Sequence, residues 1–309
     1  MSKNGTHRST NNQQLLTPLV AHSEPVVYLE CQGDEVICAD KPMVIESAWP
    51  LIVNSQHWLT VLCTPTKLDY FTLGFLYNEG LITVPEGVLK LQIGQEGEDV
   101  IRVELQDRDL RLPQRRTLTS GCGGGITFVD LAAAREPLNS SLRVTVGQIS
   151  SLMKRLRTII ADDRHRIGGF HAAALSDGHQ LSIINTDIGR HNTLDKVAGE
   201  CLTRNIPMQE SILLTTGRIS TEMLGKAARM QTPVVVTLNS PTNLAVELAN
   251  QWNITLIGYA RGTKMHVYSG WQRITPPDKR QRQSHRPLPE HRLQDFCATK
   301  KAPSLTYTP

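Results

Sequence analysis

The stretch that indicates the fold class runs from residue 211 to residue 237 and reads SILLTTGRISTEMLGKAARMQTPVVVT. Two short aliphatic runs, 211–215 and 233–237, flank a segment, 219–230, that has the character of a helix. A strand, a glycine turn, a helix and a second strand in this order are typical of a parallel-sheet α/β domain. The pattern extends outward to strands expected at 172–175, 181–186, 254–259 and 265–268, and to helices expected at 191–204 and 241–251. Residues 116–272 are therefore expected to form an α/β domain.

The chain before this domain has a different pattern. Alternating apolar residues over 25–45, and again on both sides of Ser55-Gln56-His57, predict strands. A helix is expected to begin after Thr64 or Thr66, either of which would cap it, and to end at Asn78. Two further strands are expected within 88–105, around a turn at 94–99. Residues 23–115 are thus expected to form a smaller α+β domain. Within the α/β domain, an amphipathic helix is also expected at 146–160.

The composition of the two ends of the chain differs from that of the two domains. Residues 1–22 are polar and predict a disordered arm, and residues 273–309 are rich in proline and basic residues and predict a disordered, solvated tail. The chain has 309 residues, a net charge of +4 and six cysteines, none of them in a C-x-x-C pair. No secretory signal and no apolar run of membrane-spanning length is visible. These features favour a cytoplasmic protein with free thiols.

A cysteine lies within a run of glycines at residues 119–125, TSGCGGG. Residues 126–135 are expected to form a helix, which would place Cys122 just before a helix N-terminus. That position favours the thiolate and would lower the pKa of the thiol, making the sulfur nucleophilic. The alternative is a glycine-rich turn that carries an incidental cysteine.

Several polar clusters follow expected strands, where open α/β sheets bind ligands. His171 follows a glycine pair and is either a functional group or a packed core histidine. Segment 185–196 combines Asp187, Arg190 and His191 at the start of a helix; its structural alternative is a capped helix with surface ion pairs. Segments 215–222, 239–242 and 259–264 add further polar groups, and Ser220 is expected to cap the helix that follows it. Four cations are expected to form a basic pocket for a pyrophosphate-linked nucleotide: Arg190, Arg218, Arg261 and Lys264. The absence of a G-x-x-x-x-G-K-[ST] motif argues against a P-loop hydrolase.

These residues, in this order, resemble the FdhD family of formate dehydrogenase accessory sulfurtransferases. The resemblance covers about residues 24–272. It includes Thr64-Pro65, Leu68, Gly74-Phe75-Leu76 and Glu79-Gly80-Leu81-Ile82 in the N-terminal part. It is more specific in the C-terminal part, at Gly168-Gly169-Phe170-His171-Ala172-Ala173, Asp187-Ile188-Gly189-Arg190-His191-Asn192, Leu194-Asp195-Lys196, Gly217-Arg218-Ile219-Ser220 and Lys226-Ala227-Ala228-Arg229.

The resemblance implies a cytosolic, dimeric protein whose C-terminal domain has a cytidine-deaminase-like fold. Such a protein accepts persulfide sulfur from a cysteine desulfurase and passes it to Mo-bis(molybdopterin guanine dinucleotide) for formate dehydrogenase. Cys122 matches the persulfide-carrying cysteine of the family. The loop of Tyr259, Ala260, Arg261, Gly262, Thr263 and Lys264 falls where the family contacts the dinucleotide. His171, Asp187, Arg190, His191 and Arg218 complete the candidate cofactor-binding set. Because the zinc signature of the deaminases is absent, no metal of its own is expected.

One position departs from the family pattern. Many members carry C-x-x-C at the active loop, and Gly125 stands here in place of the second cysteine. Either one cysteine suffices, or Cys63 or Cys201 supplies the second thiol, or the protein is a non-catalytic chaperone for the cofactor; we favour the first. A cysteine hydrolase that pairs Cys122 with His171 or His191 is a third class of function, for which the sequence offers no clear oxyanion site.

Overall fold

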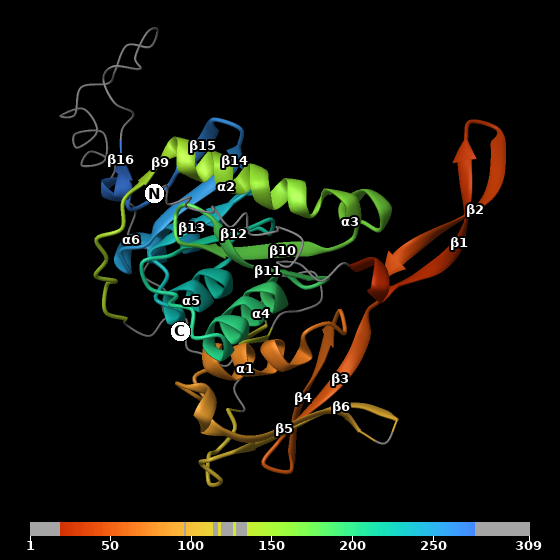
Figure 1. The fold of residues 1–309 in the computed structure, drawn as a ribbon, viewed down its shortest axis with the longest axis horizontal. Helices are drawn as coiled ribbons and strands as arrows, with labels where there is room; N and C mark the ends of the chain where they lie inside the picture. Colours follow the sequence, from red (N-terminus) through yellow and green to blue (C-terminus); the bar gives the residue numbers. More distant parts are fainter. Residues whose placement is uncertain (1–18, 96, 114–116, 119–125, 128–134, 276–309) are drawn as a thin grey trace, which may run out of the picture. The chain divides into compact units, whose positions relative to one another are not determined.

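The C-terminal half of the chain is built around a six-stranded mixed sheet with the order β11-β10-β12-β13-β14-β15 (Figure 1). The computed structural model describes residues 19–275 except 96, 114–116, 119–125 and 128–134, and all of these residues belong to one compact unit. The three central strands, β12, β13 and β14, are parallel, and the other three run antiparallel to their neighbours. The strands are β10 (His171–Ser176), β11 (Leu181–Asp187), β12 (Ile212–Thr215), β13 (Val234–Thr237), β14 (Thr255–Arg261) and β15 (Lys264–Val267).

Helices cover both faces of this sheet. Because successive side chains in a strand point to opposite faces, Leu213 packs on one side, while Ile212 and Leu214 pack on the other. The first side holds α4 (Arg190–Thr203), α5 (Thr221–Arg229) and α6 (Asn243–Gln251). The second holds α2 (Val146–Ile159), followed by the short α3 (Ala161–Arg166). The result is a three-layer α/β arrangement (Figure 1).

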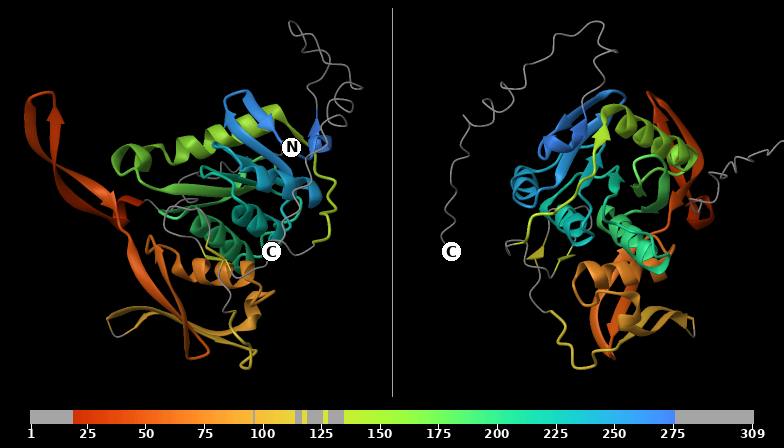
Figure 2. Two further views of the ribbon diagram at one scale, coloured as in Figure 1. Left: turned by 180° about the vertical axis from the view of Figure 1, so that it is seen from behind. Right: turned by 60° about the vertical axis from the view of Figure 1, so that its left-hand side comes forward.

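Among its described residues, the N-terminal half contains a smaller sheet and one α-helix. The sheet has the order β4-β3-β6-β5 and consists of β3 (Ser47–Val53), β4 (Gln56–Cys63), β5 (Val88–Gln95) and β6 (Glu98–Leu105). Helix α1 (Leu68–Asn78) packs against it through Phe71 and Phe75, and a 3-10 turn, η3 (Pro85–Gly87), precedes β5. Strands β1 (Ser23–Gln32) and β2 (Glu35–Val44) form a separate two-stranded ribbon (Figure 2).

Helices α1 and α4 join the two halves by crossing at two glycines. A Cβ atom at Gly74 would overlap the carbonyl oxygen of Asp195, and a Cβ atom at Gly199 would overlap that of Tyr70. Only residues without a side chain allow the two backbones to approach this closely. The α1–α4 crossing therefore fixes the smaller sheet against the α/β layers.

The strands of the two main sheets and the helices α1, α2, α4, α5 and α6 match the expectations from sequence in order and type, with ends that differ by a few residues, whereas the short helix α3 was not expected. Ser220 caps α5 as expected, since its side chain accepts a hydrogen bond from the backbone N–H of Met223. The cap expected for α1 was wrong. Lys67, in a left-handed conformation, precedes this helix without a side-chain cap, because the Thr64 and Thr66 hydroxyls accept instead from the Ile188 N–H and from Lys196.

The sequence analysis assigned a few ordered residues at each end of the fold to the disordered arm and the disordered tail. Leu19–His22 form a 3-10 helix, η2, in which Leu19 is fully buried and its backbone N–H donates to Asp163 at 3.0 Å. At the other end, Trp271–Arg273 form a 3-10 turn, η4, and β16 (Ile274–Thr275) pairs with β9 (Val144–Thr145). The remainder of the expected arm and tail lies outside the described residues. No helix in the described part of the chain is both long and apolar enough to cross a membrane.

Candidate functional site

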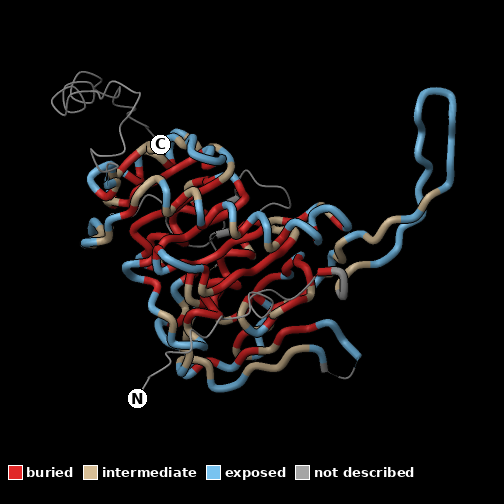
Figure 3. The backbone as a smooth tube through the Cα atoms, turned by 45° about the horizontal axis from the view of Figure 1, so that its top comes forward, coloured by how far each residue is buried: buried red, intermediate tan, exposed pale blue. Residues whose placement is uncertain are grey.

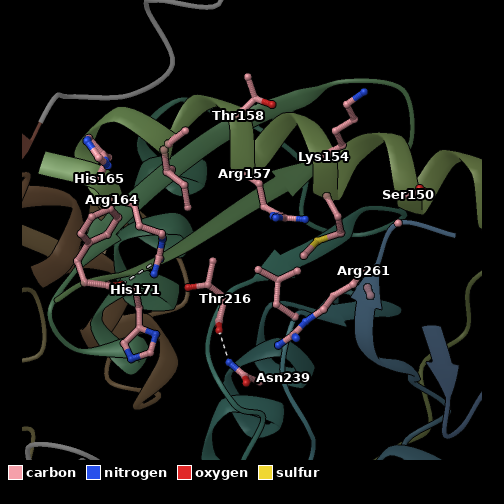
Figure 4. Close-up of a pocket in the computed structure, with 17 residues that line it drawn as sticks. Ser150, Lys154, Arg157, Thr158, Arg164, His165, His171, Thr216, Asn239 and Arg261 are labelled. Carbon is pink, nitrogen blue, oxygen red and sulfur yellow. Dashed lines mark hydrogen bonds between the residues drawn. The ribbon is translucent and has the colours of Figure 1, made fainter. Parts of the chain in front are cut away.

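A pocket of about 910 Å³ lies where the parallel strands end, beneath helix α2 (Figure 4). Thr216, Leu238 and Ala260 line it at or just beyond the carboxyl ends of β12, β13 and β14. His171, the first residue of the antiparallel β10, reaches the same edge of the sheet. The pocket therefore occupies the position at which open α/β sheets bind their ligands.

The pocket is strongly basic. Lys154 and Arg157 come from α2, Arg164 from α3 and Arg261 from the end of β14. None of its described lining residues is Asp or Glu. Figure 4 shows the side chains of Arg157 and Arg261 extending into the space between α2 and the strand ends. Four cations without a counter-charge among the lining residues favour a ligand with several negative charges.

Helix α2 is held in place over the strand ends by its cap and its apolar face. Thr145 and Gln148 form a reciprocal capping box at its start, and Leu152 and Leu156 are buried against the sheet. Lys154 and Arg157 are three residues apart and so project from one side of the helix. The capping box fixes where α2 begins, and the packing of its apolar face on the sheet presents these two cations to the pocket.

Arg164 forms one wall of the pocket. Its Nη2 atom donates to the carbonyl oxygen of Phe170 at 3.2 Å, and its guanidinium lies 5.0 Å from the centre of the Phe170 ring. The hydrogen bond and the ring contact hold the planar group in one orientation, which suits recognition of a phosphate or carboxylate.

His171 contributes a neutral imidazole. Burial lowers its pKa below the ordinary value of 6.5, and the nearby charges of Arg190 and Arg164 lower it further. At neutral pH the ring is therefore uncharged and presents one donor and one acceptor nitrogen. Arg190 is buried at the start of α4, and both Arg190 and His171 lie beside Gly217. A Cβ atom at residue 217 would lie 2.9 Å from the Cβ of Arg190 and 3.6 Å from the Nδ1 of His171. Gly217 therefore allows these two side chains to lie close together.

The segment expected to contact a cofactor, residues 259–264, comprises the end of β14, the two-residue turn after it and the first residue of β15. Ala260, Arg261 and Gly262 line the pocket, whereas Thr263 and Lys264 are exposed and are not among its lining residues. Tyr259 packs its ring against His266, with centroids 5.2 Å apart. Half of this segment thus forms part of the pocket.

The other sequence candidates lie elsewhere. Asp187 is fully buried and its Oδ2 lies 2.6 Å from the Nζ of Lys196, so it fixes the start of α4. His191 is buried with its Nε2 3.0 Å from the Oε2 of Glu222. Burial, followed by the charge of Lys226, lowers the pKa of His191 to about 2, which keeps this ring neutral as well. Arg218 is exposed and does not line the pocket.

The polar segment 185–196 is thus largely a buried ionic network. Lys196 also donates to the Thr64 carbonyl at 3.1 Å, which ties α4 to the segment that precedes α1. Asp195 accepts from Lys226 at 2.7 Å and from Asn78 at 2.7 Å, which links α4 to α5 and α1. The alternative interpretation of this segment placed its ion pairs on the surface. That was wrong, because these pairs lie in the interior. Asp187 and Lys196 lie within this segment, but the partners of Asp195 and the Thr64 carbonyl that Lys196 binds are distant in sequence, so the local pattern did not reveal them.

Cys122 and Gly125 lie outside the described residues. On either side of their loop, Leu118 pairs with Ile126 and Thr117 with Thr127 in a short antiparallel ladder of β7 (Thr117–Leu118) and β8 (Ile126–Thr127). The helix expected over 126–135 was therefore wrong at its first two residues, which form a strand. The described ends of the loop lie side by side.

The two cysteines considered as substitutes for a second loop thiol are both buried. Burial raises the pKa of Cys63 to about 12, with the Asp187 charge contributing, and raises that of Cys201 to about 12 as well. A thiol with such a pKa is almost entirely protonated at neutral pH and is a poor nucleophile. Neither residue is suited to resolve a persulfide on the loop.

Asn239, from the polar segment 239–242 singled out in the sequence, lines the pocket, whereas Lys154, Arg157 and Arg164 line it but were not among the sequence candidates. The available signal was a pair of cations on the polar side of an amphipathic helix. That pattern is common on solvated helices, and only the packing of α2 over the strand ends distinguishes it from them.

The fold and the pocket define an α/β protein with a basic ligand site at the ends of its parallel strands. A family model described as FdhD/NarQ matches residues 44–275, so the chain belongs to the FdhD/NarQ family.

Known relatives agree with this assignment. A protein of Staphylococcus aureus (strain MRSA252), named sulfur carrier protein FdhD, is 37% identical over 262 residues, which are 82% of this chain and 97% of that protein. A protein of the same name from Bacillus pumilus (strain SAFR-032) is 35% identical over 253 residues, 79% of this chain and 92% of that protein. A crystal structure from Desulfotalea psychrophila, described as a formate dehydrogenase accessory protein, superposes with a TM-score of 0.65 at 23% identity. It covers 82% of this chain and 99% of the other, and shows the shared fold.

Proposed function

We propose that this chain is a sulfurtransferase that carries sulfur on Cys122 to a molybdenum cofactor required by formate dehydrogenase. Family membership and the names of the relatives support the general role of sulfur carrier. The observation that carries the proposal is the basic pocket, since four cations without an acidic lining residue suit the pyrophosphates of Mo-bis(molybdopterin guanine dinucleotide). The order 11-10-12-13-14 of the first five strands supports a cytidine-deaminase-like description of this domain.

The first step is an exchange of sulfane sulfur between thiols. A persulfide on a cysteine desulfurase is attacked by the Cys122 thiolate at its terminal sulfur, which gives the Cys122 persulfide and returns the desulfurase thiolate. No net oxidant or reductant is required. In the second step, transfer of a neutral sulfur atom to a reduced Mo(IV) centre returns the Cys122 thiolate and leaves a Mo(VI) sulfido group, so the two electrons come from the molybdenum.

The pocket residues bind and orient this cargo. Arg157 extends into the pocket from α2 and Arg261 from the end of β14, where both can pair with the phosphates, and the guanidinium of Arg164 is fixed in one orientation by Phe170. The neutral His171 donates or accepts a hydrogen bond without adding charge. The protein acts between a cysteine desulfurase and the catalytic subunit of formate dehydrogenase, in the cytoplasm, and as a homodimer.

The second candidate function is a chaperone that binds the same cofactor without moving sulfur. Gly125 favours it, because the loop lacks a second thiol, and the burial of Cys63 and Cys201 leaves neither of them as a substitute.

Mass spectrometry after incubation with a cysteine desulfurase and cysteine distinguishes the two functions. Sulfur transfer predicts an adduct of about 32 Da, one sulfur atom, on Cys122. A protein that binds guanosine diphosphate but never acquires this adduct would instead be the chaperone. Cys201→Ser is the matched control, since it removes a thiol that is buried.

A further inference from the structure

A second pocket, of about 540 Å³, shares no lining residue with the basic pocket at the strand ends. The interior that α1, α4 and α5 share is largely buried (Figure 3), and this pocket opens at its edge, where α1 and α5 both end. We call it the helix-end pocket. Unlike the strand-end pocket, it is lined by charges of both signs: Arg135, Arg229, Glu79 and Glu136.

The two arginines form a cationic wall in which each guanidinium has a fixed orientation. Arg135 donates from Nη1 to the Gly225 carbonyl at 3.2 Å and lies 5.1 Å from the centre of the Trp252 ring. Arg229 donates from Nε to the Tyr77 carbonyl at 3.1 Å and lies 5.3 Å from the centre of that residue's ring. Neither forms an ion pair with an acidic residue in the described part of the chain. Both groups therefore keep N–H donors for a ligand.

The two guanidinium charges are close enough to affect each other. Burial lowers the pKa of Arg135, and the charge of Arg229 lowers it further. Arginine stays protonated at neutral pH, so the two like charges repel each other. A carboxylate bound by both groups would offset this repulsion and accept hydrogen bonds from each of them.

The end of α1 forms a second wall, which is rich in acceptors. Glu79 is 6% exposed, and its Oε1 lies 3.9 Å from the Nζ of Lys226. The same Nζ contacts both carboxylate oxygens of Asp195, at 2.7 and 2.8 Å, so two carboxylates share one ammonium. Asn78 lines the pocket and donates to Asp195, but its buried Oδ1 has no hydrogen-bond partner among the described residues. This wall therefore favours a ligand group that donates hydrogen bonds and carries positive charge.

The cationic wall and the acceptor wall adjoin. Gly80 directly follows Glu79, and a Cβ atom at Gly80 would lie 3.9 Å from the Nη2 of Arg229. The Arg229 guanidinium thus lies beside the end of α1. A ligand that fits both walls must carry its anionic and cationic groups close together, as an α-amino acid does, since both are attached to one carbon atom.

We propose that the helix-end pocket binds a free α-amino acid in its zwitterionic form. Arg135 and Arg229 bind the carboxylate. Glu79 and the Oδ1 of Asn78 accept hydrogen bonds from the ammonium. A doubly charged oxyanion such as phosphate fits less well, because Glu79 and Glu136 repel it. The proposal does not depend on sulfur transfer.

Isothermal titration calorimetry of the full-length chain with L-alanine tests the charge requirement. We expect a dissociation constant below about 1 mM, which is attainable for so small a ligand when both charged groups are paired. Propionate lacks the ammonium and L-alaninamide lacks the carboxylate, so each should bind at least about tenfold more weakly. The absence of L-alanine binding would overturn the proposal. So would propionate that binds as tightly as L-alanine, because the pocket would then be a simple anion site.

A matched pair of variants tests the location. Arg135→Gln removes a cation from the pocket, whereas Arg143→Gln removes an exposed one from the same segment of chain, outside the pocket. Arg135→Gln should raise the dissociation constant for L-alanine at least about tenfold, and Arg143→Gln should leave it within about twofold of the wild type. Equal constants for the two variants would place the ligand elsewhere and overturn the proposal. If Arg135→Gln fails to fold, the comparison of L-alanine with propionate and L-alaninamide on the wild type still decides the question.

Discussion

Replacing Arg157 with glutamine should weaken the binding of guanosine diphosphate to the pocket. The substitution removes one of four cationic lining residues and leaves a shorter, uncharged polar side chain in its place. A charged hydrogen bond to phosphate contributes about 1.5–3 kcal/mol. Arg157 is exposed to solvent on the pocket side of α2, which screens the interaction, so we take about 1.5 kcal/mol, equivalent to about a tenfold rise in Kd.

The same helix provides the control. Arg155 carries the same charge but does not line the pocket, so Arg155→Gln lowers the net charge equally without removing a ligand contact. We expect its Kd to stay within about twofold of the wild type. Isothermal titration calorimetry at two salt concentrations gives both quantities, and the dependence of Kd on salt should be smaller for Arg157→Gln than for Arg155→Gln.

Arg261 allows the geometry itself to be tested. Because Arg157 and Arg261 reach the pocket from α2 and β14, the double variant should lose about 100-fold in affinity if each contacts the ligand independently. The account of the pocket would be refuted if Arg157→Gln and Arg155→Gln had the same Kd, or if the wild type did not bind the nucleotide.

Two further predictions concern the interior that positions the site. Gly74→Ala should lower the free energy of unfolding by at least about 2 kcal/mol, because its Cβ would overlap the Asp195 carbonyl and the gain in helix propensity is smaller than this cost; Gly147→Ala, whose nearest contact is 3.9 Å away, should not be destabilising in the same urea titration. His191 has a folded pKa of about 2 against about 6.5 unfolded, so its contribution to stability is present above pH 6.5 and is lost as the pH falls from there towards 2. Between pH 7 and pH 5 the wild type should lose about 2 kcal/mol more than His191→Gln, and parallel pH dependences in the two proteins would contradict this.

Much of the fold could be predicted because its strongest signals are local. The strand runs at 211–215 and 233–237, and the helix between them, are short-range patterns, and the structure has these elements within a few residues. The cap of α1 could not be predicted in the same way. Thr64 and Thr66 have the local character of caps, but their hydroxyls bond residues more than a hundred positions away.

In the candidate site, too, the residues predicted from local sequence differ from those whose role depends on the whole fold. His171 and Arg261 were expected from their positions at a sheet edge, and both line the pocket. The cations of α2 were missed because their role depends on which face of the sheet the helix covers. Asp187 has the residue type of a ligand contact, yet its charge is balanced by the buried Lys196, and burial is a property of the whole fold.

The most direct test of sulfur transfer is the formate dehydrogenase activity of a strain that lacks its own copy of the gene and expresses Cys122→Ser. Transfer of sulfur on this thiol predicts activity indistinguishable from that of the empty strain, at a protein level equal to that of the wild type, which restores activity. Wild-type activity with Cys122→Ser would contradict the account, because no persulfide could then have passed through residue 122.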